Sequence, residues 1–387
     1  MTRPANFDVS TVLQPIETAR GLPNAHYIDP QVYAKEARAV MFASWPSIGF
    51  AFDCPNAGDV MPIEFMGMPL LIVRDDDGDI GVFQNTCRHR GMILVAEKGN
   101  LRGTIRCKYH SWCYGLKGEL RSTPHVGGPG QNLHDSIDRT TLGLKRIRSH
   151  VWRDIIFVNI DEQAPAFEDY AAPLIARMKD FTAPHYPGGG GFRFDVACNW
   201  KLAVENYCES YHLPWIHPGL NSYSRLEDHY HIDAGGPCAG QGTTVYRQIQ
   251  GDKGETFPDF AGLGDFWNEG AEYPVLFPNT LLAFQRDHNY VLIVQPCATD
   301  RSIERVELFY PFEPQARADL KPLMEKNKSQ WKSVLEEDLC VVEGMQKGRH
   351  GIYFDGGKFS PVMDTPTYDF HQWVGEKLAR DGGETVQ

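Results

Sequence analysis

The hydrophobic and polar positions of the chain change their period near residue 45. Residues 29–45 begin with Asp-Pro, a common helix start, and continue with apolar residues at roughly helical spacing, which predicts one N-terminal helix. Beyond residue 45 the apolar residues occur in short β-rich runs separated by Gly, Asp and Pro, which predicts a small all-β domain ending near Ile160. Asp77 and Gly78 fit a hairpin turn inside that domain.

The pattern beyond residue 160 predicts a mixed domain. Residues 199–213 have helical spacing, and residues 280–296 and 305–312 indicate strands of an antiparallel meander. Residues 323–348 have the composition of one long helix that ends at Gly348. The expected fold class is therefore α+β, an all-β domain followed by an antiparallel sheet with helices beside it.

The change of pattern also sets the expected domain limits. We place an N-terminal helical segment at residues 1–44 and expect it to pack on the second domain. The β domain is expected at residues 45–160 and the second domain at residues 161–387. Both are of ordinary domain size.

Composition narrows the functions that the chain can have. A formal net charge of −12, from 38 basic and 50 acidic residues, argues against a nucleic-acid partner, because such binding needs Lys and Arg to neutralise phosphates. No apolar run approaches the length of a membrane span and the start of the chain lacks a signal-peptide pattern, so we expect a cytoplasmic protein without a membrane partner. Nine cysteines, an odd number, favour reduced thiols and metal ligands over a disulfide framework.

Two short motifs in the β-rich half each combine a cysteine with a histidine. The first holds Cys87 and His89, and the second, seventeen residues later, holds Cys107 and His110. Zinc also takes two cysteines and two histidines, but zinc fingers usually separate the cysteine pair from the histidine pair. Motifs that each contain both residue types suit a [2Fe–2S] cluster in which two histidines replace two cysteines on one iron. We therefore favour this cluster over zinc.

A second group of candidate ligands lies in the sequence ENYCESYHLPWIH. On a continuous helix Glu205, Glu209 and His212 would form one polar stripe. His217 would lie about 140° around the helix from His212, so both could bind one ion only if the helix breaks, and Pro214 gives a reason for a break. Two imidazoles and one carboxylate form the facial triad of non-haem Fe(II), which leaves positions open for O₂ and substrate. The alternative is that these are ordinary polar residues at a helix end.

The motifs NTCRHRG, CKYHSWCYGLKGEL and ENYCESYH, in this order, resemble the α (oxygenase) subunit of Rieske non-haem iron oxygenases. The resemblance covers nearly the whole chain and implies a Rieske domain followed by a catalytic domain of helix-grip fold. It implies that the two Cys/His motifs bind a Rieske [2Fe–2S] cluster and that His212 and His217 bind a mononuclear Fe(II). In the family the last iron ligand is an acid on a late helix, for which Asp338 is the best candidate and Glu337 the alternative.

One detail separates this chain from most ring-hydroxylating dioxygenases. Those enzymes typically carry an aspartate three residues before the first iron histidine, whereas this chain has Glu209 there. The form ENYxExYH is more similar to the oxygenases of glycine betaine, carnitine and stachydrine. The resemblance also implies that Glu209 carries electrons to the iron from a Rieske histidine of a neighbouring chain, here His110, in a homotrimer or a multiple of one.

The implied reaction is reductive O₂ activation with insertion of oxygen into an organic substrate. No dinucleotide fingerprint or flavin domain is visible, so a separate NAD(P)H-dependent reductase, possibly with a ferredoxin, is expected to supply electrons. The leading substrate is a small quaternary or N-methylated amine, hydroxylated or N-demethylated, held by cation–π contacts with aromatic residues such as Tyr207, Trp267, Tyr273, Phe277 and Phe284. The alternatives are an aromatic-ring hydroxylating dioxygenase and a Rieske electron-transfer protein without oxygenase activity.

Overall fold

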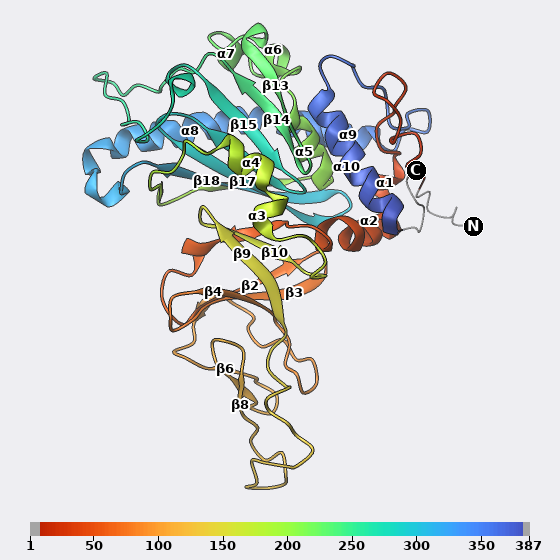
Figure 1. The fold of residues 1–387 in the computed structure, drawn as a ribbon, viewed down its shortest axis with the longest axis vertical. Helices are drawn as coiled ribbons and strands as arrows, with labels where there is room; N and C mark the ends of the chain where they lie inside the picture. Colours follow the sequence, from red (N-terminus) through yellow and green to blue (C-terminus); the bar gives the residue numbers. More distant parts are fainter. Residues whose placement is uncertain (1–7, 382–387) are drawn as a thin grey trace. The chain divides into compact units, whose positions relative to one another are not determined.

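The computed structural model describes residues 8–381. Residues 1–7 of the predicted N-terminal segment and residues 382–387 of the predicted second domain lie outside the described part. The chain divides into two compact units (Figure 1). We call residues 42–164 the β unit, and the described residues before and after them the mixed unit.

The predicted limits of the β domain, 45 and 160, lie slightly inside the limits of the β unit. Hydrogen bonds to backbone carbonyls beyond the predicted ends explain the difference. The amide of Asp161 donates to the carbonyl of Phe42 at 3.2 Å, and Arg148 donates to the carbonyl of Ala164. These residues therefore stay attached to the β unit although their sequence no longer has strand character.

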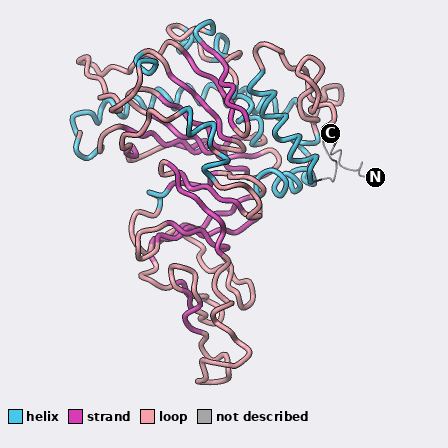
Figure 2. Tube along the Cα trace, in the orientation of Figure 1, coloured by secondary structure: helices cyan, strands magenta, loops and turns pink. Residues whose placement is uncertain are grey.

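The β unit contains two antiparallel sheets. The larger has the strand order β1-β10-β9-β4-β3-β2-β5, with bounds Ser47–Phe50, Ile155–Asn159, Arg146–Trp152, Ile80–Gln84, Met68–Arg74, Asp59–Phe65 and Gly99–Asn100. The smaller joins β6 (Ile105–Arg106), β7 (Cys113–Tyr114) and β8 (Leu120–Ser122). One hydrophobic cluster includes residues of both sheets together with Cys87 and Cys107. Loops make up most of the part around β6 to β8 (Figure 2).

The mixed unit is built on one antiparallel sheet. Its strand order is β11-β18-β17-β16-β15-β14-β13, with β12 also paired to β18. In that order the bounds are Tyr186–Pro187, Arg301–Tyr310, Asn289–Ala298, Thr280–Phe284, Ala271–Leu276, Cys238–Thr243 and His229–Gly235, with β12 at Phe192–Val196. The predicted α+β class is confirmed, although no strand was predicted for the residues that form β13 and β14.

Four longer helices accompany this sheet. They are α5 (Trp200–Cys208), α8 (Lys321–Glu337), α9 (Leu339–Gly348) and α10 (Thr365–Asp381). Helix α5 contacts strands β14, β15 and β17, and it also contacts α9 and α10 (Figure 1). The sheet therefore holds α5, which carries the first part of the candidate iron motif, against the late helices. The short helices are α3 (Phe167–Tyr170), α4 (Ala172–Arg177), α6 (Leu213–Ile216) and α7 (Pro218–Asn221).

The N-terminal helix predicted for residues 29–45 starts at Asp29 and Pro30 as predicted, but it ends at Phe42, changes to a π-helix on the way, and is preceded by a separate short helix. The segment folds as α1 (Ala25–Ile28), α2 (Pro30–Glu36) and a π-helical stretch from Ala37 to Phe42. Asp29 caps α2 by accepting the amide of Gln31 at 2.7 Å, which starts a new helix there.

A buried ion pair attaches the N-terminal segment to α5. Glu36 is fully buried and accepts from Lys201 Nζ at 2.6 Å, while His26 Nδ1 lies 3.2 Å from its second oxygen. Burial by itself raises the pKa of Glu36, but Lys201 and His26 outweigh it and lower the pKa, so the carboxylate stays charged. Breaking such a pair from one side is strongly destabilising, which makes this contact a fixed point of the mixed unit.

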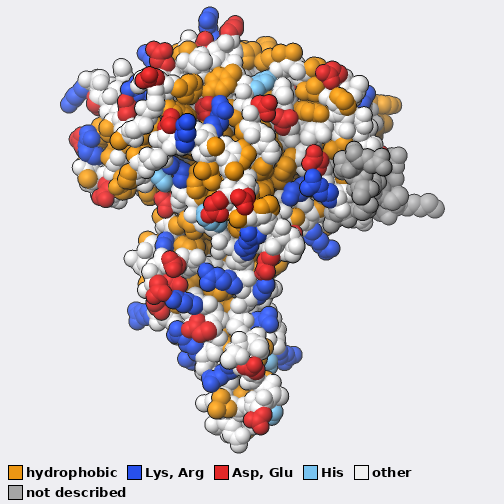
Figure 3. Space-filling model, viewed as in Figure 1, with side chains coloured by type: hydrophobic (Ala, Val, Ile, Leu, Met, Phe, Trp, Pro, Cys, Tyr) orange, Lys and Arg blue, Asp and Glu red, His pale blue; other side chains and the backbone are white. Residues whose placement is uncertain are grey.

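The surface agrees with the acidic but mixed composition. On the face shown in Figure 3, basic and acidic side chains are interspersed. Among residues 8–381, no helix has both the length and the hydropathy that crossing a bilayer requires.

Candidate functional site

Two loops of the β unit have the same backbone geometry and carry the four candidate cluster ligands. In the first, the amide of Gly91 bonds to the carbonyl of Cys87 at 2.9 Å; in the second, the amide of Ser111 bonds to the carbonyl of Cys107 at 3.0 Å. Gly91 and Ser111 both have positive φ, 72° and 57°, a conformation that glycine adopts freely and serine rarely adopts. The two turns therefore place Cys87 and Cys107 at equivalent positions, while His89 and His110 differ by one position within the turn.

The side chains on these loops differ in exposure. Cys87 and Cys107 are buried, whereas His89 and His110 are exposed and their ring centroids lie 4.7 Å apart. His89 also stacks on Trp112 at 4.8 Å. Burial, with the neighbouring His110 and a nearby arginine, lowers the pKa of His89, which favours the neutral imidazole that a metal requires. The set fits a cluster with buried thiolates and solvent-facing histidines.

The cysteines are all free thiols, as the sequence analysis expected. Cys113, which follows the second loop, lies with its sulfur 3.1 Å from the carbonyl oxygen of Ser111. The sulfur of Cys87 lies 3.2 Å from the hydroxyl of Tyr114, whose oxygen also accepts the amide of Arg88 at 3.0 Å. Tyr114 thus supports the first loop from within the core.

In the mixed unit the structure brings His212, His217 and Asp338 together. One candidate ligand atom from each lies within 4.8 Å of the other two. Asp338 Oδ1 is 3.6 Å from His212 Nε2 and 3.1 Å from His217 Nε2, yet it is buried and has no hydrogen-bond partner among the described residues. A buried carboxylate oxygen that faces two imidazole nitrogens fits a divalent metal ion with open coordination positions.

The chain reaches this geometry because α5 ends earlier than predicted. Residues 199–213 were expected to form one helix with a polar stripe, but α5 stops at Cys208 and Glu209 is extended, with φ −125° and ψ 160°. The Glu209 carboxylate accepts the backbone amides of Tyr211 and His212, which competes with helix continuation. The break therefore lies before His212 and not at Pro214, which instead lies in the first turn of the short helix α6.

Glu205 does not form the predicted helical stripe with Glu209, because α5 ends before Glu209. It is buried in α5, where Tyr27 donates to it at 2.5 Å and His371 Nε2 lies 3.3 Å away. Arg349 lies 3.6 Å from its other oxygen. Glu205 therefore joins the N-terminal segment to α9 and α10 and has no place in the candidate metal site.

Each histidine of the triad is held by a glutamate through its other ring nitrogen. Glu209 Oε1 lies 2.7 Å from His212 Nδ1, and Glu337 Oε2 lies 2.7 Å from His217 Nδ1. Such partners fix the orientation of a ligating imidazole. Glu337, the alternative third ligand, thus contacts the Nδ1 side of His217, whereas Asp338 faces the Nε2 atoms of both rings.

Carboxylates also act on the protonation of His217. Burial lowers its pKa, but Asp338 and Glu337 outweigh burial and raise it. Because a metal binds the neutral imidazole, protons compete with the metal at this position as the pH falls.

The late helix predicted for residues 323–348 is divided at Asp338. Helix α8 ends at Glu337 and α9 begins at Leu339, and Asp338 between them keeps helical angles. The side chain of Gln346 accepts the amide of Asn199 at 2.9 Å and donates to the carbonyl of Tyr27 at 3.0 Å. This glutamine holds α9 against the start of α5, and so helps to place Asp338 opposite the histidines.

A cavity with an aromatic wall adjoins the triad, and we call it the metal cavity. Its wall consists of Tyr207, Tyr273, Tyr290 and Trp331. The rings of Tyr290 and Trp331 lie 4.8 Å apart, and those of Tyr273 and Trp331 lie 6.3 Å apart. Sequence reasoning missed Tyr290 and Trp331, although Trp331 lies seven residues before Asp338 and helical spacing places the two on similar faces.

Only two of the five aromatic residues named from the sequence line the metal cavity. Tyr207 and Tyr273 do so. Trp267 and Phe284 instead pack on Phe181, with centroid distances of 4.6 and 4.9 Å, and Phe277 packs on Phe370 at 5.1 Å. These three are ordinary core residues.

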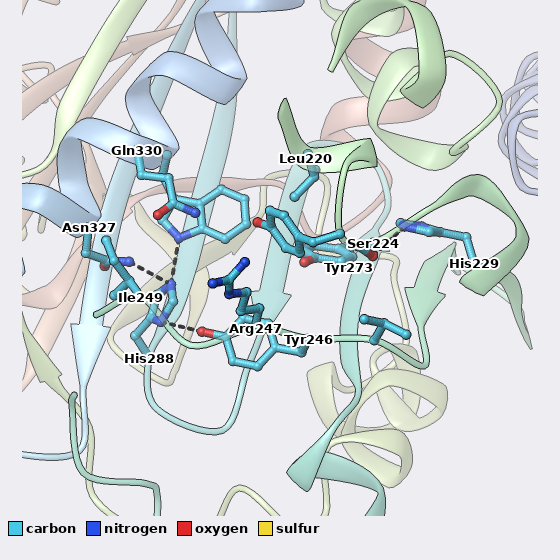
Figure 4. A pocket seen from close by; sticks show the side chains of 13 residues that line it. Leu220, Ser224, His229, Tyr246, Arg247, Ile249, Tyr273, His288, Asn327 and Gln330 are labelled. Carbon is cyan, nitrogen blue, oxygen red and sulfur yellow. Dashed lines mark hydrogen bonds between the residues drawn. The ribbon is translucent and has the colours of Figure 1, made fainter. Parts of the chain in front are cut away.

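A buried network fixes Trp331 from behind, and two of its members, Tyr246 and His288, are labelled in Figure 4. The indole Nε1 donates to His288 Nε2 at 2.6 Å, and His288 Nδ1 lies 2.9 Å from Asp287 Oδ1. Tyr246 donates to the same aspartate oxygen at 2.7 Å. Tyr246, His288 and Trp331 line a cavity that we call the inner cavity, and it shares Tyr273 and Trp331 with the metal cavity.

Two further histidines, His229 and His231, lie in strand β13. His229 lines the metal cavity, but Gln241 lies 2.8 Å from its Nδ1 and the Ser224 hydroxyl 3.0 Å from its Nε2. Both ring nitrogens are therefore occupied. Gln241 in turn donates to the carbonyl of Glu209 at 3.2 Å, so His229 supports the metal site indirectly.

Two family models match the chain. The Rieske [2Fe-2S] domain matches residues 44–136, and the ring hydroxylating alpha subunit (catalytic domain) matches residues 177–380. A cluster domain and a catalytic domain of this kind define the oxygenase component of a Rieske-type non-haem iron oxygenase. The chain belongs to the family of ring-hydroxylating alpha subunits, which confirms the resemblance, the enzyme class and the two iron cofactors expected from the sequence.

The individual relatives share about a quarter of their residues with this chain or fewer. The glycine betaine monooxygenase oxygenase subunit of Chromohalobacter salexigens is 24% identical, covering 92% of this chain and 85% of the relative. The choline monooxygenase of Arabidopsis thaliana is 25% identical, covering 92% and 82%. A solved quaternary ammonium Rieske monooxygenase, described for carnitine oxidation and inter-subunit electron transfer, has a TM-score of 0.75 at 20% identity over 96% of this chain and 98% of that one. At that identity the structural match shows a shared fold.

We predict that the bond from Trp331 to His288 stabilises the fold by about 1 to 3 kcal/mol, because a buried indole N–H without an acceptor is costly. In a double-mutant cycle of His288→Leu and Trp331→Phe, urea unfolding should give a coupling energy of about 1 kcal/mol or more. The matched control is the cycle of His288→Leu with Trp267→Phe. The Trp267 indole bonds to Asp180 at 3.2 Å and not to His288, so these two changes should be additive. Strict additivity of His288→Leu with Trp331→Phe would contradict the prediction.

Proposed function

We propose that this oxygenase component oxidises a small quaternary or N-methylated amine at an iron held by His212, His217 and Asp338. The observation that carries the proposal is the aromatic wall of three tyrosines and one tryptophan next to the triad. Aromatic faces attract an organic cation, most strongly where water is excluded. The names of relatives that act on glycine betaine and choline support the same substrate class.

The roles of the residues follow from their positions. When bound, the iron supplies the redox chemistry for O₂ and the Rieske cluster supplies electrons. Glu209 and Glu337 keep the two imidazoles turned toward Asp338. The network of Asp287 and His288 fixes Trp331, so the aromatic wall presents a constant surface to the substrate.

The β unit would hold the cluster through Cys87, His89, Cys107 and His110. This assignment rests on the matching turns of the two loops and on the short distance between the histidine rings. The exposure of both histidines gives a partner direct access to the cluster.

Two kinds of protein partner fit the surfaces. A separate NAD(P)H-dependent reductase must deliver electrons, as the designation of a relative as an oxygenase subunit suggests. We also propose a homotrimer or a multiple of one, in which the cluster loops of one chain meet Glu209 of the next. The cluster loops expose the basic residues Arg88, Arg90 and Lys108. The recess around Glu209 is lined by three acids, Glu205, Glu209 and Asp364, and by two bases, Arg349 and Lys358, so its acids outnumber its bases by one.

Complementary charge of this kind favours a head-to-tail contact, in which each chain donates one face and receives with another. The exposed rings of Tyr211 and Trp215, next to Glu209 in the chain, add apolar area to the receiving face, and Tyr109 adds some to the donating loops. The cytoplasmic location expected from the sequence stays a prediction.

Oxygen consumption tests the substrate class. With a reductase and NAD(P)H present, we expect glycine betaine, choline or carnitine to stimulate O₂ uptake and to yield an oxidised or demethylated product, because their ammonium groups suit the aromatic wall. Aromatic acids serve as the comparison panel. Uptake coupled to product with the aromatic acids alone would replace our proposal with ring hydroxylation, and an iron content matching only the cluster would indicate an electron carrier.

Metal analysis tests the assignment of ligands. Asp338→Ala should remove the mononuclear iron and all oxygenation while leaving the Rieske signal in electron paramagnetic resonance. Glu337→Ala should keep the iron with about 10- to 100-fold weaker affinity, because it removes only the partner of His217. Cys107→Ser should abolish the Rieske signal. If Glu337→Ala lost the iron and Asp338→Ala retained it, the two roles would have to be exchanged.

The electron path is tested at Glu209. Glu209→Gln and Glu209→Ala should retain both metal centres and a reducible cluster, but cluster oxidation by O₂ in the presence of substrate should become very slow. Asp364→Asn is the matched control, since it lines the same recess without contacting His212. Wild-type oxidation rates in Glu209→Ala, or a strictly monomeric active enzyme, would rule out a bridge between chains.

A further inference from the structure

Arg247 is a charged side chain close to the metal cavity that the oxygenase chemistry does not use. Arg247 lines the inner cavity, and it also lines an outer recess of about 480 Å³ that includes Gln330 and Val334 of α8. Leu220 lines the recess, the inner cavity and the metal cavity alike, so the three spaces adjoin one another. Arg247 is therefore at the boundary between the outer recess and the inner cavity.

Arg247 is exposed to solvent, and no acid of the described residues pairs with its charge. Within residues 8–381 it has no hydrogen bond and no ion pair, and no carboxylate lines the inner cavity. The other charges of the recess are engaged: Lys326 donates to the carbonyl of Gln250 at 2.8 Å, and Glu337 holds His217. Figure 4 shows the guanidinium turned toward the middle of the inner cavity.

A guanidinium in this position has one preferred kind of ligand. It stays charged at any relevant pH and offers several donors in a fixed plane, which match a carboxylate or a phosphate. The hydroxyl of Tyr223 adds a polar group to the same cavity. Burial raises the pKa of Tyr223, and the positive charge of nearby Arg247 acts to lower it. The aromatic wall faces the metal, whereas these polar groups face the recess.

We propose that Arg247 binds an anionic group, a carboxylate in the simplest case, at the end of the substrate remote from the metal. This inference rests on the proposed function, in which the ammonium end lies against Trp331 and Tyr273. Arg247 is then a specificity-determining residue. It selects substrates that carry both charges over amino alcohols, and it orients them with the methylated nitrogen toward the triad.

The test compares substrates that differ only in the remote group, namely glycine betaine and choline. Arg247→Gln should raise KM for the acid by about tenfold or more, as expected for loss of a charge-assisted hydrogen bond near solvent. It should leave kcat for the acid and KM for choline nearly unchanged. Arg247→Lys should restore part of the difference, and Lys326→Gln, a change of the same size on the same recess, should have no selective effect.

Salt dependence gives a second measurement. In the wild-type enzyme KM for the acid should rise with NaCl more steeply than KM for choline, because an exposed ion pair is screened. Arg247→Gln should remove that difference. These slopes separate binding of an anion from a general effect of Arg247 on folding.

The outcomes distinguish this inference from the proposed function. If no quaternary amine is turned over, the proposed function fails. The effect of Arg247→Gln is then measured with an aromatic acid and its amide in place of glycine betaine and choline. If amines are turned over but Arg247→Gln changes KM equally for acid and alcohol, or for neither, Arg247 is not an anion site. An equal selective effect of Lys326→Gln would likewise overturn the assignment.

Discussion

The metal site of the mixed unit depends on a buried carboxylate oxygen that accepts no hydrogen bond from the described residues. Asp338 Oδ1 faces the Nε2 atoms of His212 and His217, while both Nδ1 atoms are turned to glutamates. If the Nδ1 atoms carry the protons, three electron pairs converge on one point, an arrangement that is repulsive unless a cation or protons lie between them. The free energy released when a cation binds there can therefore stabilise the junction of α8 and α9 as well as the site itself.

The protein holds this unfavourable junction with contacts that lie far from it in sequence. Gln346 connects α9 to the residue that caps α5, and Glu36 connects the N-terminal segment to Lys201 in α5. Glu205 adds a third connection through Tyr27, His371 and Arg349. Buried, charge-assisted contacts of this kind are costly to break from one side, so they restrict the relative motion of the helices that carry the ligands.

Much of the metal chemistry could be predicted from the sequence because it depends on residue types at short spacing. The Cys/His motifs and the pair His212 and His217 are local, and the structure places each pair as a unit. The end of α5 was missed because a side chain, Glu209, caps the backbone of the residues that follow it. No residue with low helix propensity marks that position, so periodicity alone favoured a longer helix.

The lining of the cavity was harder to predict, because it depends on tertiary contacts. Trp267, Phe277 and Phe284 have the composition of a cation-binding site but pack in the core, whereas Tyr290 and Trp331 come from a strand and a late helix that meet only in the fold. The role of Asp287 and His288 was hidden for the same reason, since their partner Trp331 lies more than forty residues later in the chain.

The two glutamates behind the histidines also affect the electrostatic field in the cavity. With Asp338 they place three carboxylates around a divalent ion, which leaves a net negative charge when the imidazoles are neutral. A negative centre in a partly dry cavity attracts positive groups and repels negative ones over several ångströms. A negatively charged molecule of the same size as the substrate would then be repelled from the metal. The residues that orient the ligands therefore also keep anions away from the centre.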